Sequence, residues 1–290
     1  MVYFFRSKNI QLLYTMSQFL STELFSSEPS KLPNPTVSNP VSIVPTPPPN
    51  ATPTLGQTTP QDKIEIRQNP VQYYVKASFM ITYILLLTTA TITFIEAMRT
   101  KDTSVRHILN LETCISIVAG YFYSVFLSQI DGFSKEDKPI DWSDITKTRY
   151  IDWSITTPMM LLVLCIVLGA NINKKISLGT LGTVILSNYV MLYTGYLGET
   201  KTLTRPVATA SGFAAFFAMF YTIYHKFIAP KYIFENNCLF FFFVLVWALY
   251  GLVYFLPETY KNISTNLLDC ISKCLIGLGL WVYYSKIVVL

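Results

Sequence analysis

Two charged residues lie in the middle of an apolar stretch near the carboxyl terminus. Asp269 and Lys273 are four residues apart within residues 262–288, so on a helix they share one face. A charge at the centre of a membrane segment costs several kcal/mol and is normally functional. A lysine amine can condense with an aldehyde, and the protonated imine that results is a buried cation that needs carboxylates close by. Asp269 is one candidate for such a carboxylate.

A second group of residues recurs at helical spacing between positions 149 and 163. Steps of three, four and seven residues place four side chains on one inward stripe of a helix: Arg149, Asp152, Thr156 and Val163. Asp152 is therefore a second candidate carboxylate, and the two buried cations and two buried carboxylates balance to zero. The same charges could instead form salt bridges with only a packing role, and the charges alone leave this alternative open.

The composition places these residues in a membrane. Of the 290 residues 51% are apolar and only 13% are charged, whereas about a quarter of an average soluble domain is charged. A helix needs about 20 residues to cross a bilayer, and hydrocarbon forces each segment to satisfy its own backbone. Uncharged stretches of this kind cover residues 77–95, 113–130, 153–173, 176–198, 206–224 and 236–257, and residues 262–288 add a seventh. The sequence therefore predicts an all-α bundle of seven transmembrane helices over residues 72–290, with the lipid bilayer as partner.

The first quarter of the chain has a different composition. Residues 1–71 are rich in Pro, Ser and Thr and cannot bury enough apolar surface to offset the entropy of ordering. They predict a mostly disordered tail. Basic residues such as Arg99, Lys101 and Arg106 gather in loops on one side of the predicted bundle, whereas acids dominate the loop 130–148 on the other side. The positive-inside rule then places the amino terminus outside the cell and the carboxyl terminus in the cytoplasm.

Two further classes of function are set aside. A formal net charge of +5 without a concentrated basic face argues against a nucleic-acid partner. The cysteines lie in apolar stretches and lack the spacing of a disulfide framework or a zinc site, so we expect core residues and no metal. They are Cys114, Cys165, Cys238, Cys270 and Cys274.

The motifs on the third and seventh predicted helices resemble those of the microbial (type 1) rhodopsin family. The third helix carries Arg-Tyr-x-Asp-Trp-x-x-Thr-Thr-Pro over residues 149–158, the seventh carries Asp269-x-x-x-Lys273, and the resemblance covers residues 72–288. It implies a light-activated protein, not an enzyme, that holds all-trans retinal in the core of the bundle as a Schiff base on Lys273. Asp152 would be the main counterion and Asp269 the second carboxylate, with Arg149 and Thr156 beside them.

The resemblance also implies which residues line the retinal pocket. Flat aromatic rings on both faces would confine the polyene. The residues expected there are Tyr123, Trp153, Thr157, Met191, Gly195, Gly212, Phe216, Trp247, Tyr250 and Tyr254. Thr157 and Asn188 occupy the pair of positions that couples the third and fourth helices in algal channelrhodopsins. Gly251 departs from the family, which usually has proline at this position.

Two positions bear on what the protein does with light. Val163 lies about 16 Å from Asp152 along the helix and cannot donate a proton, although outward proton pumps of this family have a carboxylic acid there. Glu112, about three turns from Tyr123, points either into the inner half of the bundle or into cytoplasmic water at the helix start. Acidic groups along a polar track favour cations, and Glu96, Ser116, Ser124 and Asn188 could extend such a track.

These features favour a light-gated cation channel, and a slow outward proton pump or a photosensory receptor are the alternatives. The segment from Glu96 through Glu112 to Tyr123 is most similar to rhodopsins of giant viruses, some of which are described as channels and others as weak pumps. A transporter without a chromophore would leave Lys273 unexplained. Family members commonly form trimers or pentamers, so we expect a homo-oligomer that transports cations or protons.

Overall fold

The fold is given by a computed structural model that describes residues 70–135 and 139–285. Apart from its last two residues, the predicted tail 1–71 lies outside these ranges. The helices in chain order are α3 (Pro70–Arg99), α4 (Thr103–Lys135), α5 (Trp142–Asn171), α6 (Leu178–Glu199), α7 (Arg205–Ile223), the π-helix η1 (Tyr224–Ile228), α8 (Phe234–Val253), α9 (Glu258–Asp269), the π-helix η2 (Cys270–Leu275) and α10 (Ile276–Ser285).

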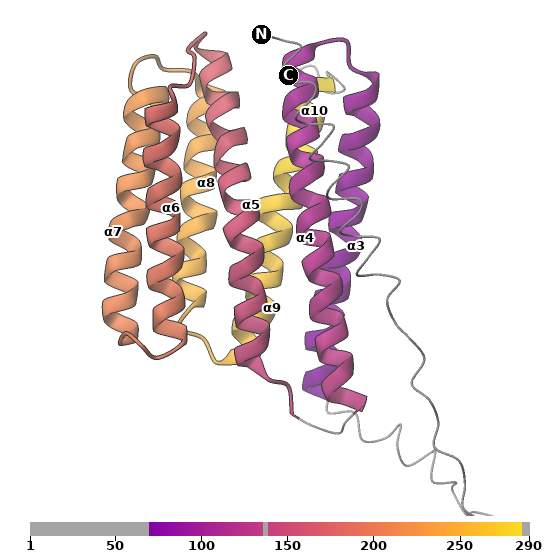
Figure 1. Ribbon diagram of the computed structural model, residues 1–290. Coiled ribbons are helices and arrows are strands. Elements are labelled where there is room, and N and C mark those ends of the chain that lie inside the picture. Colours follow the sequence, from indigo (N-terminus) through magenta and orange to yellow (C-terminus); the bar gives the residue numbers. More distant parts are fainter. Residues whose placement is uncertain (1–69, 136–138, 286–290) are drawn as a thin grey trace, which may run out of the picture. The chain divides into compact units, whose positions relative to one another are not determined.

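The described helices form seven rods that lie side by side, because α7 continues into η1 and α9 continues through η2 into α10 (Figure 1). Six of the rods are long and apolar enough to cross a membrane. The other rod is α6, whose 22 residues span about 33 Å but include glycines, threonines and Asn188 that lower its hydropathy. The chain is therefore an all-α integral membrane protein, as the sequence predicts.

Polar side chains begin several helices where the chain leaves a loop. Asp102 accepts hydrogen bonds from the backbone N–H groups of Ser104 and Val105 at the start of α4. Asp141 caps α5, and the Ser177 hydroxyl accepts from the Thr180 N–H group at the start of α6. These caps satisfy N–H groups that have no partner within the helix.

The alternating direction of the rods gives the bundle two ends. We call the end that holds the first residues of α3, α5, α7 and α9 the Glu258 end, and the opposite end the Arg99 end (Figure 1). One apolar cluster packs α5 against α7, α8 and α10, and a second packs α3 against α4 and the Lys273 turn. Lys273 lies in η2, and such π-helical turns are frequent at functional sites.

The cysteines are distributed differently from the prediction. Cys165 and Cys274 are buried and Cys270 is half-buried, whereas Cys114 and Cys238 are exposed on the outside of the bundle. The expectation of five core cysteines is therefore wrong for Cys114 and Cys238. The expectation assumed that a cysteine in an apolar stretch is buried, but a helix in a bilayer is apolar on its outward face as well as on its inward face.

Candidate functional site

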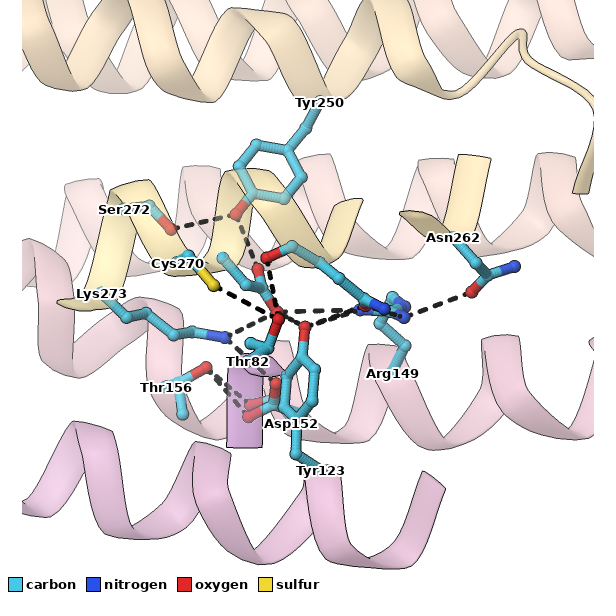
Figure 2. Close-up of polar contacts among 12 residues, drawn as sticks. Thr82, Tyr123, Arg149, Asp152, Thr156, Tyr250, Asn262, Cys270, Ser272 and Lys273 are labelled. Carbon is cyan, nitrogen blue, oxygen red and sulfur yellow. Dashed lines mark hydrogen bonds and ion pairs between the residues drawn. The ribbon is translucent and has the colours of Figure 1, made fainter. Parts of the chain in front are cut away.

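The centre of the bundle holds an amine between two carboxylates (Figure 2). Lys273 Nζ lies 3.2 Å from Asp152 Oδ2 and 3.2 Å from Asp269 Oδ2. All three side chains are buried, so few water molecules compete for these contacts. A buried cation is tolerated only with such partners, and the site is built to hold a positive nitrogen in place.

Asp269 is the more heavily bonded of the two carboxylates. The Tyr250 hydroxyl donates to its Oδ1 at 2.6 Å, and the Tyr123 hydroxyl donates to its Oδ2 at 2.8 Å. The Ser272 hydroxyl lies 2.9 Å from the Tyr250 oxygen and can donate a hydrogen bond to it. Among the described residues Asp152 accepts from the Thr156 hydroxyl, at 3.3 Å, and from Lys273. The less solvated Asp152 is therefore the better acceptor for a proton that leaves the Lys273 nitrogen.

Arg149 continues the network toward the Glu258 end (Figure 2). Its guanidinium lies 3.7 Å from Asp269 and donates to Asn266 at 2.9 Å and to Asn262 at 3.2 Å. The rings of Phe79 and Phe126 also pack around it, with centroids 5.3 and 4.9 Å from Cζ. Hydrogen bonds and cation–π contacts together compensate for the burial of this second cation.

A cavity extends from Lys273 between α5, α6, α7, α8 and α9. The centres of water molecules can occupy a volume of about 160 Å³ in it. This is roughly ten times the volume that one water requires. Its lining is mainly apolar and aromatic and includes Met191, Phe216 and Trp247, and Lys273 lines it as well. Trp153 and Tyr250 meet edge to face with ring centroids 5.5 Å apart. An elongated apolar aldehyde fits this arrangement, because the walls suit a polyene and the amine suits the aldehyde.

Comparisons with known proteins agree with this geometry. The profile of the family described as bacteriorhodopsin-like protein matches residues 74–287. The chain belongs to this family. Rhodopsins of this family bind retinal, and the bundle has the microbial rhodopsin fold.

Individual relatives place the chain near viral rhodopsins. The crystal structure of viral rhodopsin OLPVRII is 41% identical, with a TM-score of 0.68 over 74% of this chain and 99% of that one. The blue light-absorbing proteorhodopsin from Med12, at 23% identity and a TM-score of 0.60, shares the fold over 73% of this chain and 98% of that one. The green-light absorbing proteorhodopsin of Gamma-proteobacterium EBAC31A08 is 27% identical over 151 residues, 47% of this chain, and the match spans only 60% of that relative.

Most residues that the resemblance assigned to the retinal pocket of this microbial rhodopsin do line the cavity. They are Trp153, Thr157, Met191, Gly195, Gly212, Phe216, Trp247, Tyr250 and Tyr254. Tyr123 does not line the cavity. Its hydroxyl donates to Asp269, and its ring packs against Arg149. Asp152 and Thr156 lie beside Lys273 without lining the cavity, and Glu112 is separate from it.

The sequence missed a cluster of charges at the Glu258 end of the cavity. Lys261 Nζ lies 3.0 Å from both carboxylate oxygens of Glu199 and 2.8 Å from Glu258. Lys261 and Glu199 both line the cavity, although they come from α9 and α6. Glu199 is the only charged residue of α6. Its partner Lys261 can be found only from the contact between α6 and α9.

Thr157 and Asn188 are joined as their family positions suggest. The Asn188 side-chain amide donates to the Thr157 hydroxyl at 2.9 Å, which links α5 to α6 inside the bundle. A double-mutant cycle with Thr157→Val and Asn188→Leu is expected to give a coupling of about 0.6 kcal/mol, typical for such bonds in membranes. Thermal bleaching of the pigment measures it. Thr183→Val on the exposed face of α6 is the control, and a coupling of zero would contradict the bond.

Gly251 allows α7 and α8 to approach closely. A Cβ atom at this position would collide with the ring of Phe213 on α7. Gly251→Ala is therefore expected to destabilise the fold by about 1–3 kcal/mol, and Phe213→Leu should restore most of the loss. The midpoint of thermal bleaching is the measurement. An unchanged midpoint for Gly251→Ala would contradict the close approach.

Val163 and Glu112 lie on different sides of the interior. Val163 is buried in the apolar cluster of α5, α7 and α8. Glu112 is only 2% exposed, so it points into the bundle, and the alternative of an acid in cytoplasmic water is excluded. The inner half of the described bundle therefore offers a buried carboxyl group on α4 instead of α5.

Proposed function

We propose that this chain is a light-driven proton transporter that carries all-trans retinal on Lys273. The proton moves toward the Glu258 end, which the distribution of loop charges places outside the cell, so transport is outward. The observation that carries the proposal is the position of Lys273 Nζ, 3.2 Å from Asp152 and joined through Asp269 to polar groups that lead to the Glu258 end. When bound, retinal supplies the absorption of light and a change of shape that displaces the Lys273 nitrogen.

The residues on the Glu258 side can receive and pass on a proton. Asp152 is the first acceptor, because it lies within hydrogen-bond distance of Nζ and has few competing donors. Tyr123 and Asn266 form hydrogen bonds with Asp269 and Arg149 on the route outward. Asp152 reaches these groups through the Lys273 nitrogen, and hydrogen-bonded groups can pass on a proton, whereas a larger cation needs an open path.

Glu112 serves the opposite side as the internal acid that returns a proton to the Lys273 nitrogen. Val163 cannot donate a proton, whereas Glu112 can, because it is a buried carboxyl group. It lies beside Gly277, one turn beyond Lys273. A general acid must reach its target directly or through one water. Helix α4 can therefore supply the function that α5 lacks.

A light-gated cation channel is the second candidate. It is favoured by the polar seam between α3 and α4, where the hydroxyls of Thr93 and Thr113 lie 2.8 Å apart in the interior close to Glu112. In the sequence, the acids Glu96 and Glu112 favour the channel. We place the channel second because the part of the inner half between α5, α7 and α8 is closely packed with apolar side chains such as Val163, Phe220 and Phe243.

Photocurrents in voltage-clamped cells separate the two candidates. The holding voltage and the external sodium concentration are varied, and the sign of the current is followed. The proposal predicts an outward current at every accessible voltage, independent of sodium, together with acidification of the medium that a protonophore abolishes. A current that reverses sign with the cation gradient would contradict the pump and support the channel.

Glu112→Gln is expected to slow recovery of the photocycle by roughly 100-fold, because the internal acid is lost. Flash spectroscopy at two values of internal pH measures it, and the slowed recovery should become dependent on pH. Glu235→Gln, an exposed acid in the first turn of α8 at the same end, is the matched control. An equal recovery rate in wild type and Glu112→Gln would remove Glu112 from the mechanism.

A further inference from the structure

Three polar side chains on α3 and α4 are buried without a protein partner. Thr89 is 1% exposed and Ser116 is fully buried, and among the described residues neither hydroxyl has a hydrogen bond of normal geometry, although the thiol of Cys274 lies close to Thr89. Within the described ranges the nearby Glu112 carboxyl group also has no hydrogen bond or ion pair. Other buried threonines of the same helices, such as Thr93 and Thr113, bond to their own backbone. Thr89 and Ser116 therefore present free hydroxyls to the interior.

Two of these side chains, Thr89 and Glu112, border Gly277 of α10. A Cβ atom at Gly277 would lie 3.0 Å from Thr89 Cγ2 and 3.1 Å from Glu112 Oε2, so both side chains border this glycine. Ser116 follows Glu112 by four residues and lies on the same face of α4. The cluster is one turn beyond Lys273, because Gly277 follows Lys273 by four residues.

The energetics require a partner for these groups. A buried hydroxyl without a hydrogen bond costs about 1–3 kcal/mol, and a buried carboxyl group costs more. A water molecule is stable in a protein interior when it makes about three hydrogen bonds to polar groups. The Glu112 carboxyl and the two hydroxyls offer that number. A hard metal cation prefers about six or more oxygen ligands, which this cluster does not supply.

We propose that Glu112, Thr89 and Ser116 form a buried hydration site, and that its water connects the Glu112 carboxyl to the turn of Lys273. Gly277 borders the Glu112 and Thr89 side chains, and a larger residue there would crowd both of them. The site deepens the proposed function, because the relay role rests on Glu112 acting as the internal acid. The binding of water rests only on the three unpartnered groups.

Infrared difference spectroscopy of the pigment in H₂¹⁸O tests the site. A hydrogen-bonded water band that shifts with ¹⁸O is expected in wild type, to be lost in Glu112→Gln and to be displaced or lost in Thr89→Val and Ser116→Ala. Thr89→Ser keeps the hydroxyl and should keep the band. Thr91→Val on the exposed face of α3 is the control, because that hydroxyl bonds only to Leu87 O.

The outcomes of this test are distinct from those of the proposed function. A band unaffected by both Thr89→Val and Ser116→Ala would overturn the hydration site, and so would a band that appears only with added sodium. Gly277→Ala should weaken the band and slow recovery of the photocycle severalfold. If wild type moves no proton but shows the band, the transport proposal fails and the water site stands.

Discussion

Lys273→Ala is expected to remove the visible absorption band that all-trans retinal produces with the wild-type protein. The amine is the group in the cavity that lies between two carboxylates, and its loss leaves the aldehyde without a nucleophile and Asp152 and Asp269 without their cation. Absorption spectra of purified protein after addition of retinal measure the effect. Loss of the whole band is expected, not a shift in wavelength.

Two controls make this result specific. Lys76→Ala removes an exposed lysine paired with Asp131 at the surface of the bundle and should leave the band unchanged. A double variant, Lys273→Ala with Asp152→Asn, removes the uncompensated buried charge, leaves Asp269 beside Arg149 and guards against simple misfolding. A wild-type-like band in Lys273→Ala would end the account of the site.

Asp152→Asn is expected to reduce light-driven proton transport by roughly 100-fold or more, because the first acceptor is lost while the geometry is preserved. The acceptor lies 3.2 Å from Nζ, and the amide that replaces it cannot take up a proton. Acidification of a suspension of illuminated cells measures transport. The visible band should survive, since Asp269 still neutralises the cation.

The matched control for this variant lies on the same helix. Asp144→Asn changes an exposed acid of α5 that accepts a hydrogen bond from Gln129, and it should transport at the wild-type rate. If Asp152→Asn transports normally and Asp269→Asn does not, the roles of the two carboxylates are exchanged.

The sequence predicted the parts of the site that lie within single helices. Asp269 and Lys273 share a helix face at a spacing of four residues, and the stripe from Arg149 to Val163 is buried as its spacing requires. The helices themselves are predictable because hydrocarbon demands long apolar segments. The pairing of Lys273 with Asp152 follows from the family motifs together.

Contacts between different helices were harder to predict from the sequence. Glu199 meets Lys261 only because α6 and α9 converge at the Glu258 end, and no spacing in the sequence records that distance. The approach of Gly251 to Phe213 depends in the same way on tertiary packing. The burial of Glu112 was open because its helix begins only about two turns earlier, so that its side chain could have reached water.

The central claim is that Lys273 carries the pigment, and covalent mapping tests it most directly. Reduction of the illuminated pigment with borohydride fixes retinal to its lysine, and mass spectrometry of the fragments locates it. The account predicts a single label on Lys273. A label on Lys261, the other lysine that lines the cavity, would contradict it.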